Sequence, residues 1–196
     1  MTGKHRPLAR VVAASLGLLL LSCAPAARIY LNPDADMAFY TRIAVLPFTN
    51  LSSEGLAGPR VTRAFITSLI MTDRYQIVQP EEFRTALQKG NVLPEPDGTF
   101  DLQKLKEVAL QLGATGVLRG AVSEYTMQRS DNGDIPVLSF DAELLDANTG
   151  NVVWRSAIAR RGKSRIPVFG HSSRSLGRLT QDACDELVAQ LRKGAI

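Results

Sequence analysis

The residue types that most often carry catalysis or bind metals are sparse in this sequence. It holds two histidines, His5 near its start and His171 in the segment FGHSSRS. A histidine close to serines could serve a Ser/His/Asp hydrolase, because the imidazole takes the proton of the nucleophilic hydroxyl. The same position also suits a loop or a helix cap. A hydrolase using His171 is therefore one hypothesis, and so few histidines exclude a histidine-rich metal site.

The remaining chemistry-bearing groups point to structure rather than catalysis. Cys184 precedes Leu187 and Leu191 at helical spacing, which predicts that its thiol packs in a core, where a thiol is unreactive. Glu81 and Glu82 suit the first turn of a helix. No glycine-rich phosphate-binding motif is present in the sequence. We therefore predict no catalytic residue, no cofactor and no metal.

Residues 1–22 have the organisation of a secretory signal peptide. Lys4, Arg6 and Arg10 form a basic start, and an apolar run from Val11 to Leu21 follows. The run has about 11 residues, whereas a membrane-spanning helix needs roughly 20. The segment thus predicts export and removal rather than a transmembrane anchor.

The sequence Leu20-Leu21-Ser22-Cys23 resembles the bacterial lipobox. This resemblance implies cleavage before Cys23, transfer of a diacylglycerol group to its thiol and acylation of the new N-terminus, with fatty acids such as palmitate. Several acyl chains hold a protein firmly on a membrane, whereas a single chain does so only marginally. Ala24, in place of an aspartate, implies the outer membrane and its periplasmic face. The alternative is an ordinary signal peptide followed by a coincidental cysteine.

The net charge of the whole chain is misleading. It is +4, from 23 basic and 19 acidic residues, but removal of residues 1–22 takes away three basic residues and leaves about +1. Between Asp146 and Asp182 the sequence has no acid and seven basic residues: Arg155, Arg160, Arg161, Lys163, Arg165, Arg174 and Arg178. This basic region predicts contact with lipid headgroups, cell-wall polymer or an acidic partner, or else a merely solvated face. Aromatic residues are not interleaved with it, which disfavours nucleic acid.

Hydrophobic periodicity predicts the elements that must position these residues. Strands are expected at 42–48, 74–79, 115–128, 135–146 and 151–161, and helices at 56–71, 80–90, 101–113 and 173–193. Turn sequences SDNGD and ANTG join the last three strands into an antiparallel meander. We therefore predict an α+β fold, close to α/β, with a single mixed sheet of about five strands packed by about four helices. It would form one globular domain, 41–196, after a lipidated N-terminus and tether, 23–40.

Three stretches resemble one superfamily of bacterial envelope proteins. They are RIAVLPFTNLSS with the later RYQIVQPEEF, then LGATGVLRGAVSEY, and then AELLDANTGNVVW. Together they resemble the TolB amino-terminal-like domain of the CsgG and LpoB types of lipoprotein. The resemblance implies the fold over about residues 41–193 and carries no catalytic set.

We therefore expect an outer-membrane-anchored, periplasmic lipoprotein that acts as a non-catalytic interaction or assembly module of an envelope machine. Its partners would be the membrane, through the lipid on Cys23, and an envelope protein or cell-wall component. A homo-oligomer is compatible with this reading. The alternatives are a ring-forming subunit of a CsgG-like export assembly and the hydrolase. The ring is disfavoured because the two insertions that could form membrane-spanning hairpins, 126–136 and 162–173, are short and polar or basic.

Overall fold

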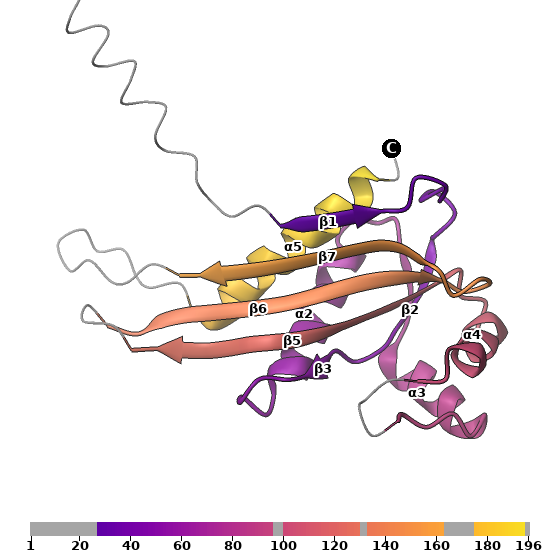
Figure 1. Ribbon diagram of the computed structural model, residues 1–196, viewed down its shortest axis with the longest axis horizontal. Helices are drawn as coiled ribbons and strands as arrows, with labels where there is room; N and C mark the ends of the chain where they lie inside the picture. The colour runs from indigo at the N-terminus through magenta and orange to yellow at the C-terminus, as the bar shows by residue number, and fades with distance from the viewer. Residues whose placement is uncertain (1–26, 96–99, 130–132, 163–174, 195–196) are drawn as a thin grey trace, which may run out of the picture.

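The computed structural model describes residues 27–95, 100–129, 133–162 and 175–194. They form one mixed sheet of seven strands and four helices (Figure 1). The strands are β1 (Arg28–Leu31), β2 (Arg42–Val45), β3 (Thr49–Asn50), β4 (Gln76–Val78), β5 (Gly116–Gln128), β6 (Ile135–Asp146) and β7 (Val152–Arg161). The helices are α2 (Ala57–Ile70), α3 (Pro80–Lys89), α4 (Leu102–Gln111) and α5 (Leu176–Lys193).

The sheet is antiparallel on one side and parallel on the other. Its strand order is β1-β7-β6-β5-β2-β4, with β3 also paired to β5. Strands β5, β6 and β7 form the antiparallel meander, whereas β2 runs parallel to both β5 and β4. The predicted α+β class, mixed sheet, meander and set of four helices are therefore confirmed.

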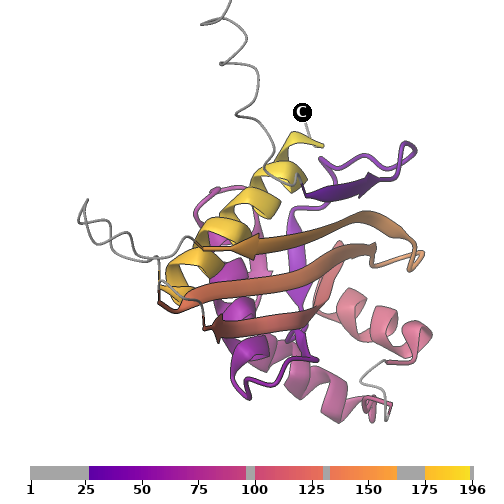
Figure 2. The same ribbon diagram turned by 60° about the vertical axis from the view of Figure 1, so that its left-hand side comes forward.

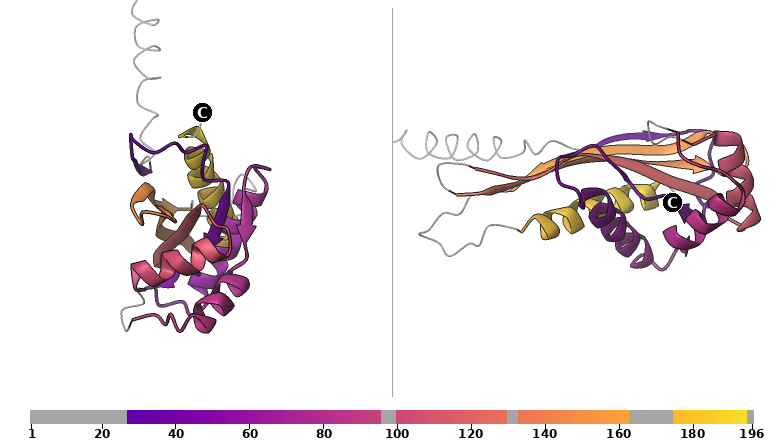
Figure 3. Two further views of the ribbon diagram at one scale, coloured as in Figure 1. Left: turned by 90° about the vertical axis from the view of Figure 1, so that its right-hand side faces the viewer. Right: turned by 90° about the horizontal axis from the view of Figure 1, so that it is seen from below.

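The helices cover the two faces of the sheet unequally (Figures 2 and 3). Helices α2 and α5 lie side by side on one face, where Phe65 and Leu187 join a core that includes Phe140 and Trp154 of the sheet. Helices α3 and α4 build a second core on the opposite face, against β2, β4 and the start of β5. The rest of that opposite face, on β6 and β7, carries no helix among the described residues. We call it the open face.

Two strands add to the five that periodicity predicts. Strand β1 lies inside the segment 23–40, which we expected to be a tether, and pairs antiparallel with β7. All four of its residues are exposed, so no apolar/polar alternation identifies it in the sequence. Strand β3 is only two residues long and lies between the strand predicted at 42–48 and the helix predicted at 56–71.

Tyr40 ties the start of β2 to the turn between β6 and β7. Its hydroxyl donates a hydrogen bond to the Asp146 carboxylate at 2.8 Å. Burial raises the pKa of Asp146, but hydrogen bonds from the Thr149 backbone, the Tyr40 hydroxyl and the Asn148 backbone outweigh it, so the pKa lies below its ordinary value. The ionised carboxylate is thus favoured in the folded state.

Replacing Tyr40 with phenylalanine should lower the free energy of unfolding by about 1.5–3 kcal/mol at neutral pH, the usual contribution of a hydrogen bond to a charged group. Because the folded-state pKa of Asp146 is depressed, its contribution is present above the ordinary carboxyl pKa and is lost as pH falls through the folded value. The difference between Tyr40→Phe and the parent should therefore shrink in acid. Urea unfolding at neutral pH and near pH 3 measures it, and an equal difference at both would contradict this account.

Candidate functional site

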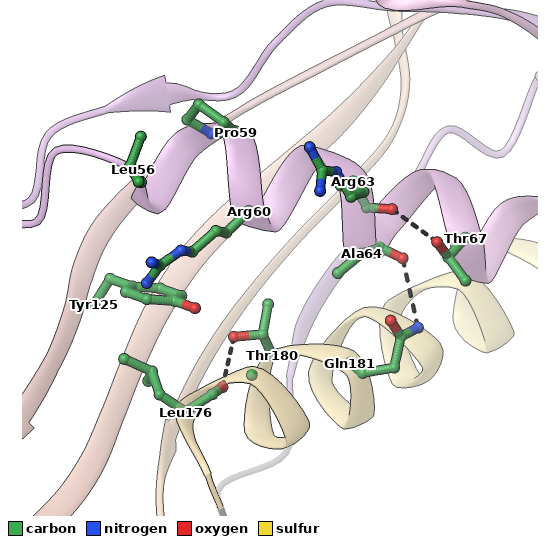
Figure 4. A pocket seen from close by; sticks show the side chains of 11 residues that line it. Leu56, Pro59, Arg60, Arg63, Ala64, Thr67, Tyr125, Leu176, Thr180 and Gln181 are labelled. Carbon is green, nitrogen blue, oxygen red and sulfur yellow. Dashed lines mark hydrogen bonds between the residues drawn. The ribbon is translucent and has the colours of Figure 1, made fainter.

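A groove lies between α2 and the first turns of α5, and Tyr125 of β5 is among the residues that line it (Figure 4). Its volume is about 520 Å³. The residues lining it are Leu56, Pro59, Arg60, Arg63, Ala64, Thr67, Tyr125, Leu176, Gly177, Thr180 and Gln181. We call it the α2/α5 groove.

Helical spacing explains why these side chains face the groove. Val61, Phe65 and Leu69 form the buried stripe of α2, and the neighbouring stripe, at spacings of three and four, holds Arg60, Arg63, Ala64 and Thr67. On α5, Gly177, Thr180 and Gln181 share one stripe in the same way. The start of α5 is fixed by Ser175, whose hydroxyl accepts a hydrogen bond from the Arg178 backbone N–H at 3.2 Å.

Polar contacts join the two helices at one end of the groove. The Gln181 side-chain amide donates to the Ser68 hydroxyl at 2.9 Å and to the Asp185 carboxylate at 2.9 Å. The Ser68 hydroxyl in turn donates to Asp185 at 2.6 Å. The walls of the groove are therefore held at a fixed separation, as a preformed binding site requires.

The other end of the groove carries positive charge beside apolar surface. The Arg60 guanidinium lies 6.0 Å from the centre of the Tyr125 ring and 3.9 Å from the Glu54 carboxylate. Both members of that ion pair are about half exposed, so solvent screens it. Arg63 is exposed and makes no ion pair within the described part of the chain. Arginine is enriched in protein interfaces, and the groove residues include no nucleophile beside a base.

A second cluster of charges lies on the open face. Arg119 of β5 and Glu143 of β6 are directly opposite in register. The Nε atom of Arg119 lies 2.6 Å from the Oε1 atom of Glu143. Arg155 of β7 reaches Asp141 at 3.5 Å and Glu143 at 3.7 Å. Burial raises the pKa of Asp141, with Arg155 opposing this effect and Glu143 adding to it. A hollow of about 240 Å³ lies beside the cluster, between Arg119, Leu51 and Phe100.

The predicted basic region is more nearly neutral than its sequence indicates. Arg155 pairs with Asp141 and Glu143, and Arg160 pairs with Glu186 of α5. Arg161 and Arg178 are exposed. Lys163, Arg165 and Arg174 lie outside the described residues. The partner acids come from a neighbouring strand and a helix, so counting charges along one segment misses them.

Among the described residues, the candidate reactive thiol is not placed for catalysis. Cys184 is fully buried, and burial, with a smaller effect of Asp185, raises the pKa of its thiol. It therefore stays protonated and unreactive, as its spacing predicts. His171 and the predicted lipidation site, Cys23, lie outside the described residues. In the described part of the chain, no group of three or more His, Cys, Asp or Glu residues could hold a metal ion, and none of its helices is long and apolar enough to span a membrane.

Sequence reasoning missed the α2/α5 groove entirely. The available signal was the polar stripe Arg60, Arg63 and Thr67 next to the buried stripe of α2. By itself, that stripe indicates an ordinary solvated face. Its role in a groove becomes visible only when α5, which follows more than a hundred residues later, packs beside it.

Comparison with known proteins gives one family match and several similar structures. The family model of the peptidoglycan-synthase activator LpoB matches residues 25–158. No curated protein matches the sequence. The PelC dodecamer from Paraburkholderia phytofirmans has a similar chain, with 20% identity, 85% of this chain and 96% of that chain covered, and a TM-score of 0.58.

Two further solved structures are similar at the level of the fold. Lipoprotein GNA1162 from Neisseria meningitidis has 16% identity, covers 78% of this chain and 99% of its own, and gives a TM-score of 0.52. The hypothetical protein CT253 from Chlamydia trachomatis has 14% identity, covers 79% of this chain and 97% of its own, and gives a TM-score of 0.51. At such identities the likeness concerns the fold alone. The resemblance to TolB and CsgG stays a prediction.

Proposed function

Since the chain belongs to the family of the peptidoglycan-synthase activator LpoB, whose model spans more than half of it, we propose that it binds and activates a peptidoglycan synthase without chemistry of its own. The family description names an activator and not a catalyst, which supports an interaction module of the envelope. The buried thiol of Cys184 and the groove without a nucleophile–base pair agree with that role.

The α2/α5 groove is the surface we assign to the synthase, and it is the observation that carries the proposal. It combines a concave shape with exposed Leu56 at its rim and with Arg60 lying over Tyr125. Interfaces place arginine anchors inside a polar rim, where a few such residues supply most of the binding energy. The ring of buried Tyr125 lies under the Arg60 guanidinium. Arg63 has its guanidinium available for a carboxylate of the partner.

The domain would work at the periplasmic face of the outer membrane, held by lipid on Cys23. Support comes from the signal-peptide organisation of residues 1–22 and from the lipobox resemblance at Cys23. The exposed Arg161 and Arg178 remain available for anionic headgroups or cell-wall polymer.

The double variant Arg60→Glu with Arg63→Glu should weaken synthase binding by about tenfold or more, equal to ~1.4 kcal/mol or more. Both changes place negative charge where the partner's carboxylates are expected. The measurement is the rate of glycan polymerisation by the synthases of the native host, with and without added lipoprotein, together with direct binding to each synthase.

Arg84→Glu is the matched control. Arg84 is another exposed helical arginine in a weak ion pair, 2.6 Å from Glu81, and it lies on α3 against the other face of the sheet. It should bind and activate like the parent. Equal losses in the control and the double variant, or no loss in either, would remove the groove from the proposal.

A homo-oligomer is a second proposal, supported only by the fold shared with the PelC dodecamer. Sizing of the mature lipoprotein in detergent tests it, and a monomer at all concentrations would contradict it. No observation on the described residues favours the CsgG-like export ring or the hydrolase.

A further inference from the structure

Strand β1 forms an edge of the sheet and is unusually exposed and apolar for its length. Ile29, Tyr30 and Leu31 have exposed fractions of 53%, 50% and 40%. Figure 1 shows β1 as the outermost strand beside β7, with the end of α5 next to it. By register, Ile29 and Leu31 lie on the side of the sheet that carries α5, and Tyr30 lies on the other side. Exposed apolar groups therefore flank the edge on both sides, as at a contact surface.

No strand among the described residues pairs with the outer side of β1. The Asn32 backbone N–H donates to the Val153 carbonyl at 2.9 Å, so the alternate residues Arg28 and Tyr30 also direct their backbone groups to β7. Ile29 and Leu31 then direct their N–H and C=O groups outward, because β1 ends the strand order. These groups need water or polar partners, which excludes burial in pure hydrocarbon.

Charged side chains of both signs flank this edge, with a small excess of basic ones. Arg28 belongs to β1 itself, and Leu31 lies against Gly194 at the end of α5, whose last turn carries exposed Arg192 and Lys193. Asp34 and Asp36 follow in the loop after β1 and offset part of this charge. The three basic and two acidic side chains leave a net positive charge, which suits anionic lipid headgroups.

The length of chain before β1 leaves the edge close to the point of lipid attachment. Only residues 24–27 separate Cys23 from Arg28. Five Cα-to-Cα steps reach at most about 18 Å when fully extended. If Cys23 carries its lipid, β1 therefore cannot leave the neighbourhood of the membrane surface.

We infer that the outer edge of β1 is a membrane-contact surface, seated at the level of the lipid headgroups. The inference rests on the proposed lipidation of Cys23. Aromatic and aliphatic side chains beside basic ones favour the boundary between headgroups and acyl chains. The outward backbone groups of Ile29 and Leu31 stay hydrated at that depth.

A second protein copy fits this edge less well. Strand β1 has four residues and is followed by Asn32-Pro33, and proline has no N–H with which to extend strand pairing. A stable protein interface buries about 800 Å² on each partner, far more than a four-residue edge presents. Lipid is therefore the occupant we assign.

This contact orients the whole domain. Strand β4 is at the opposite end of the strand order, about 24 Å away for five strand spacings of roughly 4.8 Å. The α2/α5 groove lies on a face of the sheet rather than at the β1 edge, so membrane contact leaves it open to a partner.

The test places a fluorescent reporter at the edge. Tyr30→Trp in the mature lipoprotein is compared with Leu93→Trp, whose exposed position follows α3, in phosphatidylethanolamine–phosphatidylglycerol vesicles containing brominated lipid. Buried Trp154 gives the same background in both. Tryptophan at position 30 should be quenched several-fold more strongly than at position 93. Equal quenching at both positions, or a doubled particle mass without quenching at position 30, would overturn the inference.

A second arm separates this inference from the lipid anchor itself. Mass spectrometry of the native N-terminal peptide reports whether Cys23 is acylated. In parallel, the unacylated chain 23–196 is coupled through Cys23 to a maleimide lipid in the same vesicles, since buried Cys184 does not react. Selective quenching at position 30 in the coupled chain supports the edge contact even if native acylation is absent, and lack of it contradicts the contact even if acylation is present.

Discussion

Replacing Gly120 with valine should lower the free energy of unfolding sharply and move the unfolding transition to a much lower urea concentration than in the parent. A Cβ atom at this position would overlap the backbone carbonyl oxygen of Asp141 and the ring of Phe48. The carbonyl belongs to the β5–β6 ladder, and Phe48 is buried against Phe65 and Phe140. Neither neighbour can move without breaking strand pairing or repacking the core. The expected cost is about 3 kcal/mol or more, a large share of the stability of a domain.

Gly55→Val is the matched control for Gly120→Val. No atom lies within 4 Å of a Cβ built at Gly55, and its φ is not in the left-handed region. Its unfolding midpoint in urea, followed by circular dichroism, should stay close to that of the parent. If the two variants unfold at the same urea concentration, the close packing around Gly120 does not determine the fold as we describe.

Replacing Cys23 with serine should move nearly all of the protein out of the membrane fraction. A hydroxyl cannot take the place of the thiol as the acyl acceptor, and no described helix could anchor the chain. A single acyl chain binds membranes with an association constant of only about 10⁴ M⁻¹, so loss of the whole set leaves little affinity. If the chain activates a synthase as we propose, that activation should also fall in cells, because the protein is no longer concentrated at the membrane.

Cys184→Ala separates the effect of lipidation from the general effect of losing a thiol. Cys184 is fully buried, so its replacement should cost some stability while leaving the protein with the membrane. Fractionation of outer membrane and periplasm, with mass determination of the N-terminal peptide, measures both variants. Retention of Cys23→Ser in the outer membrane would show that something other than this lipid holds the domain there.

The sequence predicts a helix or strand correctly wherever one side of that element is buried and the other side is exposed to solvent. In β6, Leu138, Phe140 and Leu144 face the core while Ser139 and Asp141 are partly exposed, and this alternation is plain in the sequence. Strand β1 gives no such signal, because both of its sides are exposed. Its place in the sheet depends on β7, more than a hundred residues away.

The candidate site was far less predictable than the fold. The α2/α5 groove exists because Arg60, Tyr125 and Thr180 are brought together from three elements. No local sequence pattern predicts that these residues lie close together. The basic region shows the converse error. Its charges are local and easily counted, but Glu143 and Glu186 neutralise part of them from other elements.

The pairing of β1 also determines how the domain would respond to mechanical force. Its N-terminal residue, Arg28, would be nearest to a lipid on Cys23, and among the described strands it pairs with β7 alone, through four register pairs. A pull along the strand loads all of these contacts together, whereas a pull away from the sheet opens them one after another from Arg28. Tension between membrane and cell wall would thus peel β1 first and lengthen the link to the lipid. The helices and the six remaining strands would keep their packing while the domain gained reach.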